Sequence, residues 1–83
     1  MYVSPKDILL SDNFEGKHFS EGSLVQVRKA LARVLETKRE LRPETVFNDV
    51  CVTGDGTYTV FYKYLPGVGG SDTIGLVRVV KKK

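Results

Sequence analysis

The stretch that decides the fold is residues 45–65, which read TVFNDVCVTGDGTYTVFYKYL. Two segments of alternating polarity flank a Gly54-Asp55-Gly56 turn signal, an arrangement typical of a β-hairpin. If Asp55 and Gly56 form a two-residue turn of the primed type, Gly54 lies opposite Thr57 and the strands cover about residues 45–53 and 57–65. The turn therefore predicts the register of the whole hairpin.

Because side chains alternate along a strand, this hairpin has two chemically different faces. One face carries Val46, Val50, Val52, Phe61 and Leu65. The other carries Phe47, Asp49, Cys51, Tyr58, Val60, Tyr62 and Tyr64. Burying the second face would bury Asp49 and expose most of the valines. We therefore expect the valine face to form the core and the tyrosine face to meet solvent or a partner.

The most regular pattern in the chain predicts a long amphipathic helix over about residues 21–41. Its apolar residues recur at spacings of three and four, and they are Leu24, Val27, Leu31, Val34, Leu35 and Leu41. Ser20 or Ser23 is the expected N-terminal cap. Pro43 disfavours helical geometry at the preceding residue, so the helix is expected to end near Leu41.

The segments on either side complete the predicted fold. Ser4-Pro5-Lys6-Asp7 resembles a helix start and predicts a short helix over about residues 5–11, with an extended conformation of residues 8–10 as the alternative. Residues 12–22 read as a polar loop, and a third strand is expected over about residues 74–80. The prediction is an α+β fold in which the long helix packs on one face of a three-stranded antiparallel meander.

Composition indicates a globular chain without a membrane span. The 83 residues are 41% hydrophobic and 28% charged, and we expect one domain over residues 1–83. No apolar run approaches the roughly 18 residues of a spanning helix, and the N-terminus lacks a signal-peptide pattern. We therefore predict no membrane partner and a cytoplasmic location, which the single cysteine fits.

Positive charge is concentrated in the predicted helix and at the C-terminus. Residues 26–42 contain six basic residues against two acidic ones, and residues 81–83 form a tail of three lysines that we expect to be flexible. Such clusters are typical of phosphate-binding surfaces, although a lysine tail is equally typical of a solubilising terminus.

No catalytic, cofactor or metal pattern stands out. His18 and Cys51 are the only residues of their kinds, and neither lies in a nucleophile or ligand spacing signature. The glycine-rich segment 66–73 lacks the Lys-Ser/Thr ending of a phosphate loop. The interpretation is a non-enzymatic protein with no cofactor and no metal.

Two binding hypotheses remain, and the first is nucleic-acid binding. Basic side chains would contact phosphates, and tyrosines on the exposed sheet face would stack on unpaired bases. The predicted site consists of Arg28, Lys29, Arg33, Tyr58, Tyr62, Tyr64, Lys81, Lys82 and Lys83.

The alternative is a protein-interaction or assembly module, including a homodimer, that uses the same tyrosine face. Tyrosine is enriched at protein interfaces, and an exposed sheet edge can accept a strand from a neighbour. This hypothesis accommodates Phe47 and Val60, which would otherwise face water.

Overall fold

The protein folds as one helix packed on a four-stranded mixed sheet. The computed structural model describes residues 2–38, 41–67 and 72–82, so the predicted contributions of residues 39–40, 68–71 and Lys83 lie outside the described residues. The elements in chain order are the 3-10 helix η1 (Pro5–Asp7), β1 (Ile8–Glu15), α1 (Glu21–Glu36), β2 (Val46–Thr53), β3 (Gly56–Pro66) and β4 (Asp72–Lys81). The α+β class is confirmed, but the three-stranded meander is incomplete.

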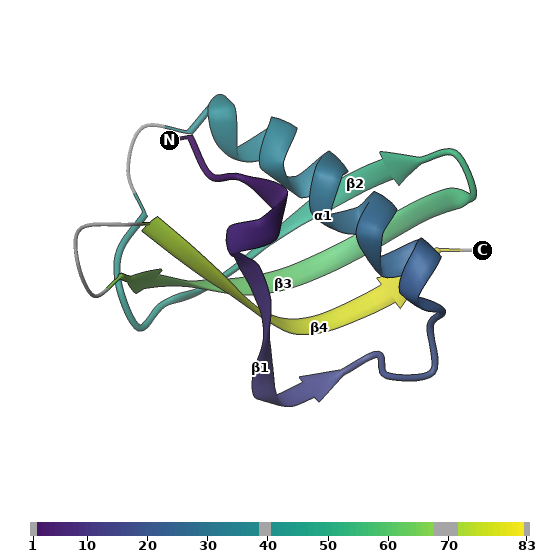
Figure 1. The fold of residues 1–83 in the computed structure, drawn as a ribbon, viewed down its shortest axis with the longest axis horizontal. Coiled ribbons are helices and arrows are strands. Elements are labelled where there is room, and N and C mark those ends of the chain that lie inside the picture. Colours follow the sequence, from purple (N-terminus) through teal and green to yellow (C-terminus); the bar gives the residue numbers. More distant parts are fainter. Residues whose placement is uncertain (1, 39–40, 68–71, 83) are drawn as a thin grey trace.

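The fourth strand is β1, which pairs in parallel with β4 and gives the sheet order β1-β4-β3-β2. Strands β2, β3 and β4 form the expected antiparallel meander. Figure 1 shows α1 lying across one face of this sheet. Strands β1 and β2 are therefore the two outer strands, and α1 connects them.

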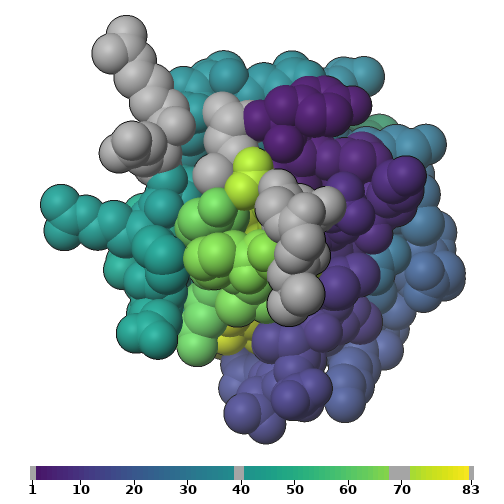
Figure 2. Space-filling model, turned by 60° about the vertical axis from the view of Figure 1, so that its left-hand side comes forward, coloured from purple at the N-terminus to yellow at the C-terminus, as the bar shows by residue number. Residues whose placement is uncertain are grey.

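The N-terminal prediction is wrong beyond its first turn. Pro5 and Asp7 bound a single 3-10 turn in which the Asp7 N–H donates to the Ser4 carbonyl at 2.9 Å. The chain then becomes extended at Ile8, and the segment read as a loop continues β1 as far as Glu15. Pairing with β4, more than 60 residues away in the chain, selects the extended alternative. The N-terminal segment, purple in Figure 2, packs beside the later turns of α1, where Val3 is buried.

Helix α1 begins where predicted and ends earlier. The Ser20 Oγ accepts the Ser23 N–H at 3.1 Å, which confirms the serine cap. At the other end, the Thr37 hydroxyl donates to the Val34 carbonyl at 2.7 Å and closes the last turn. This local hydrogen bond competes with continuation of the helix. Leu41 is buried nonetheless, as part of the connection to β2.

The hairpin bends one residue earlier than expected. Thr53 pairs with Gly56, which leaves Gly54 and Asp55 at the bend. Both types of primed turn need positive φ at the first central residue, which would be Asp55, but of this pair it is Gly56 that has a positive φ, at 145°. Val52 therefore lies opposite Thr57 rather than Thr59. A shift of two positions changes the cross-strand partners but leaves every side chain on its expected face.

The orientation of the hairpin is the reverse of the prediction. Tyr58 and Tyr62 are 1% and 0% exposed beneath α1, whereas Val50 and Val52 are 49% and 73% exposed on the other side. A tyrosine ring buries more apolar area than a valine side chain, and its hydroxyl needs one polar partner at the rim of the core. Asp49 supplies such a partner at the sheet edge, so burying this face does not isolate its carboxylate.

The core lies between α1 and the sheet. The helix contributes Leu24, Val27, Leu31, Ala32 and Leu35. The sheet contributes Ile8, Phe14, Cys51, Tyr58, Val60, Tyr62, Ile74, Leu76 and Val79. The apolar stripe of the helix thus packs as predicted, but against the tyrosine face.

Candidate interaction surfaces

The three predicted stacking tyrosines belong to the core and its rim. Each hydroxyl donates to an aspartate: Tyr58 to Asp55 at 3.0 Å, Tyr62 to Asp49 at 2.5 Å and Tyr64 to Asp72 at 2.7 Å. Tyr64 is partly buried and packs against the core. The expectation that these rings are exposed for base stacking is therefore wrong for Tyr58 and Tyr62.

The surroundings of Tyr62 and Tyr64 raise the pKa of their phenols. Burial, followed by the hydrogen bond to Asp49, raises the pKa of Tyr62 well above its usual range. The hydrogen bond to Asp72 is the main cause that raises the pKa of Tyr64. Asp49 also lies 3.3 Å from the Lys38 Nζ, so Tyr62, Asp49 and Lys38 connect β3, β2 and the end of the helix.

Asp55 connects the hairpin bend to the first turn of α1. Its Oδ2 accepts the Ser23 hydroxyl at 2.8 Å and the Tyr58 hydroxyl at 3.0 Å. Hydrogen bonds from Thr53 and Ser23 are the main causes that lower the Asp55 pKa to about 2. This aspartate is therefore ionised at neutral pH and holds the bend against the helix.

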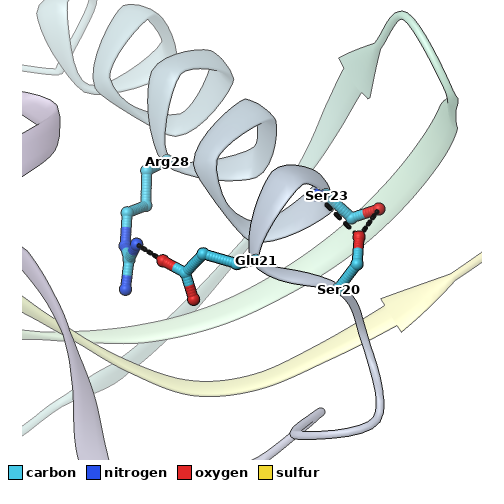
Figure 3. Close-up of polar contacts among 4 residues, drawn as sticks. All are labelled: Ser20, Glu21, Ser23 and Arg28. Carbon is cyan, nitrogen blue, oxygen red and sulfur yellow. Dashed lines mark hydrogen bonds and ion pairs between the residues drawn. The ribbon is translucent and has the colours of Figure 1, made fainter.

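The basic residues of the helix do not form one surface. Arg28 has a side chain only 19% exposed, and its Nη1 lies 3.4 Å from Glu21 Oε1, as Figure 3 shows. It is therefore poorly placed for the predicted phosphate contact. Lys29 and Arg33 are exposed, and among the described residues neither has an ion-pair partner.

Lys29 and Arg33 share a hollow of about 230 Å³ between the helix and the outer strand, here called the α1–β2 groove. Its lining is Gln26, Lys29, Ala30, Arg33, Val52, Thr53 and Gly54. The Gln26 Oε1 accepts the Gly54 N–H at 3.1 Å across one end. Within the part of the chain that the structure describes, no acidic side chain belongs to this lining, so the groove favours an anionic group.

The predicted lysine tail begins inside β4. Lys81 is the last residue of β4, and its Nζ lies 5.9 Å from the centre of the Tyr58 ring. Lys82 follows, and its N–H donates to the Thr57 carbonyl at 2.8 Å. Of the predicted site, the structure thus brings Lys29 and Arg33 together and places Lys81 beside a tyrosine.

The surface that the sequence interpretation missed is the face of the sheet opposite α1, here called the open sheet face. Its exposed aliphatic side chains are Leu9, Val46, Val50, Val52, Leu65 and Val80. Thr57, Thr59, Phe61, Lys63 and Arg78 alternate with them. The alternation of the valines is visible in the sequence, but it predicts a core face, whereas the structure leaves these side chains exposed.

Charged side chains lie between the apolar side chains of the open sheet face and beside them. Lys63 lies between Val46 and Gly75 in the pairing. Arg78 Cζ is 5.9 Å from the centre of the Phe61 ring, and Arg78 Nε is 3.3 Å from Glu15 Oε2. The Leu65 side chain leans over Gly75, where an added Cβ would lie 3.0 Å from Leu65 Cδ1.

A second hollow, of about 450 Å³, lies where β1 and β4 end. Its lining includes Glu15, His18, Arg78 and Lys81. His18 packs on Phe19 with ring centres 4.2 Å apart, and Phe19 meets the edge of the Tyr58 ring at 5.6 Å. The Glu15–Arg78 ion pair therefore belongs to the lining of this hollow, together with the rings of His18 and Phe19.

Two kinds of reactive group remain to be considered, the Cys51 thiol and clusters of side chains that could bind a metal ion. Cys51 is buried, and burial is the main cause that raises the pKa of its thiol to about 11, so the thiol is protonated at neutral pH. Within residues 2–38, 41–67 and 72–82, no cluster of three or more His, Cys, Asp or Glu side chains could hold a metal ion. The same residues include no helix that is both long and apolar enough to cross a membrane.

Comparisons with protein-family models, with curated proteins and with solved structures found no match to this chain.

Proposed function

We propose that the protein is a non-enzymatic interaction module that binds a partner protein on the open sheet face. The observation that carries the proposal is the set of aliphatic side chains on that face, with exposures from 37% at Val80 to 73% at Val52. Single exposed aliphatic residues are common on soluble proteins, but contiguous apolar patches mark interaction sites. Here the exposed aliphatic side chains occur on all four strands of one face, with Thr57, Thr59 and Lys63 between them.

The energetics favour a covered face. Fully burying a valine or leucine side chain contributes about 1.5–3 kcal/mol, so covering side chains that are roughly half exposed contributes about 1 kcal/mol each. The threonines of the face keep it soluble when it is unoccupied, and Lys63 gives it a charge at which a partner carboxylate would be favoured. The expected partner surface is apolar and carries an acidic residue.

A test compares matched substitutions on the two sides of the molecule. Val50→Asp places a charge on the open sheet face, and Val25→Asp places one on α1, where Val25 is also exposed, at 37%. Crosslinking in the source cells, followed by mass spectrometry, identifies the bound proteins. We expect one protein to crosslink in stoichiometric amount and to bind the purified chain directly. The Val50→Asp variant should lose this binding, and the Val25→Asp variant should retain it. Equal binding by both variants would refute it.

Nucleic-acid binding is the second candidate, and one observation favours it. Lys29 and Arg33 are exposed side by side in the α1–β2 groove. Because Tyr58 and Tyr62 are buried, the expected interaction is electrostatic rather than base stacking. Two to four phosphate contacts predict a slope of roughly −2 to −3.5 when the logarithm of the binding constant is plotted against the logarithm of the salt concentration. Oligonucleotide titrations should lose affinity on Lys29→Ala and Arg33→Ala and keep it on Lys63→Ala. Absence of binding at low salt would eliminate this candidate.

A further inference from the structure

Strand β4 continues past the end of its neighbour β1. The last residue of β1 that pairs with β4 is Glu15, opposite Arg78, whereas β4 runs on to Lys81. In Figure 1 the chain that follows β1 bends away from the end of β4 and rises to the start of α1. The sheet therefore has a notch beside the last residues of β4, and the hollow of about 450 Å³ lies there.

The floor of this notch is the backbone edge of β4. Four consecutive residues of the strand, 78–81, line the hollow. Side chains alternate between the two faces of a sheet, so four neighbours share one hollow only along the edge of their strand. This edge and its outer wall of Glu15, Gly16, His18 and Phe19 are here called the β4 notch.

The backbone groups of Lys81 point into the β4 notch. Hydrogen-bonded and non-bonded pairs alternate between antiparallel strands. The Lys82 N–H donates to the Thr57 carbonyl at 2.8 Å, so the neighbouring pair, Lys81 with Tyr58, is a non-bonded one. The N–H and C=O of Lys81 are therefore directed away from β3, and so is the carbonyl of Val79, two positions earlier. Among the described residues, no backbone hydrogen bond joins Val79 or Lys81 to the loop that follows β1.

Two acidic side chains act on the β4 notch, and both already have partners. Glu15 Oε2 lies 3.3 Å from Arg78 Nε. Asp55, whose charge acts on Lys81, accepts hydrogen bonds from three hydroxyl groups. Neither carboxylate is therefore free to neutralise further basic groups.

Positive charge remains around the β4 notch. Lys81 and Lys82 are exposed, and so is Lys17 in the loop that follows β1. Among the described residues, none of these three lysines has an ion-pair partner. The β4 notch thus combines outward backbone groups with positive charge, and the predicted lysine tail forms part of it.

We propose that the β4 notch binds an extended acidic segment of a partner protein, which adds to the sheet beside β4 in line with β1. Strand addition supplies hydrogen-bond partners for the Val79 carbonyl and for both backbone groups of Lys81. The charges of Lys81 and Lys82 favour acidic side chains next to them. Aliphatic side chains are expected next to Val79 and Val80, where they would meet the Phe19 ring on the α1 side and Val80 on the other.

The occupant follows from the floor as well as from the charge. The lysines would also attract DNA, but the phosphate backbone of DNA has no donor for the outward carbonyls of Val79 and Lys81. A peptide carries N–H groups at the spacing of a strand. The β4 notch adjoins the open sheet face at Val80, but its floor is a strand edge, so this inference stands independently of the proposed function.

A designed peptide tests the proposal on the full chain by NMR. The probe is the capped hexapeptide EEVVEE, whose sequence is the same in both directions. We expect saturable binding in the millimolar range or tighter, with slower amide exchange at Lys81. The Val80 amide should not change, because the alternation of pairs directs it toward β3. Absence of saturable binding, or slower exchange at Val80 in place of Lys81, would overturn the proposal.

Control ligands separate hydrogen bonding from charge. The peptide KKVVKK keeps the apolar centre and reverses the charge, so it should not bind. EEVVEE with both valine nitrogens methylated lacks two donors and should bind about tenfold more weakly. Equal binding of the methylated peptide would refute strand addition. An oligothymidylate that shifts the Lys81 amide while EEVVEE does not would assign the β4 notch to nucleic acid and refute the peptide.

Substitutions locate the bound peptide. Lys81→Gln and Lys82→Gln each remove one exposed positive charge and should weaken binding about two- to fivefold. The matched control Lys63→Gln removes a charge from the open sheet face and should leave binding unchanged. Val50→Asp should also leave it unchanged, although this variant should lose the partner of the open sheet face. Loss of EEVVEE binding in Val50→Asp would place the peptide on that face and overturn the proposal.

Discussion

Replacing Tyr62 with phenylalanine tests the orientation of the sheet. Tyr62 is 0% exposed, and its hydroxyl donates to Asp49 Oδ2 at 2.5 Å. Tyr62→Phe keeps the ring and removes only this bond, so no large cavity forms. A hydrogen bond to a charged group contributes about 1.5–3 kcal/mol.

The expected loss lies toward the lower end of that range. Asp49 keeps its contact with Lys38 at 3.3 Å, and its side chain is 21% exposed, so water can partly replace the lost hydroxyl. We expect a loss of about 2 kcal/mol in the free energy of unfolding. For a domain of this size, that corresponds to a fall of roughly 8–16 °C in Tm.

The matched control is Val52→Thr on the open sheet face. Val52 is 73% exposed, so the change should alter the free energy of unfolding by less than about 0.5 kcal/mol. Urea unfolding followed by circular dichroism measures both variants. If Val52→Thr costs more than about 1.5 kcal/mol while Tyr62→Phe is neutral, the valine face is the buried one and the reasoning fails.

Three further predictions concern pH and the backbone. The pKa of Cys51 is raised from its usual 9.0 to about 11 in the folded protein, so between these pH values only the unfolded chain releases the thiol proton. The contribution of this group to the free energy of unfolding is therefore complete below pH 9 and falls above it by up to about 1.4 kcal/mol per pH unit. Urea midpoints at pH 8.5 and 10 should show a smaller fall for Cys51→Ala, and an unchanged fall would contradict this. The lowered pKa of Asp55 contributes stability that is present above its usual value of 3.8 and lost as pH drops toward 2, so acid titrations of Asp55→Asn should be flatter there than those of the unsubstituted protein. Gly16 has a φ of 136°, and an added Cβ would lie 2.8 Å from the Phe14 ring. Gly16→Ala should therefore lower the free energy of unfolding by about 1–3 kcal/mol. A Tm within 1 °C of that of the unsubstituted protein would contradict this expected strain.

Elements with strong local signals were predictable. The spacing of Leu24, Val27 and Leu31 predicts both the helix and its buried side, and Ser20 caps it as expected. The hairpin strands and the third strand were also placed close to their observed bounds. Short-range hydrogen bonding and the period of apolar residues are sufficient for these features.

Elements that depend on distant partners were not predictable in the same way. Ile8–Glu15 is a strand because it pairs with β4, and nothing within the segment distinguishes this from a short helix and loop. The candidate site changed for the same reason. Lys29 and Arg33 were identified from charge alone, whereas their groove exists only because β2 lies beside the helix.

The sequence by itself determined which hairpin side chains share a face, because alternation along a strand is a local property of the backbone. Only the tertiary structure decided which face is buried. Three aspartates, Asp49, Asp55 and Asp72, receive the tyrosine hydroxyls at the rim of the core, so the large rings can be buried with their polar ends satisfied. Because the helix covers that face, the smaller valine side chains remain at the surface.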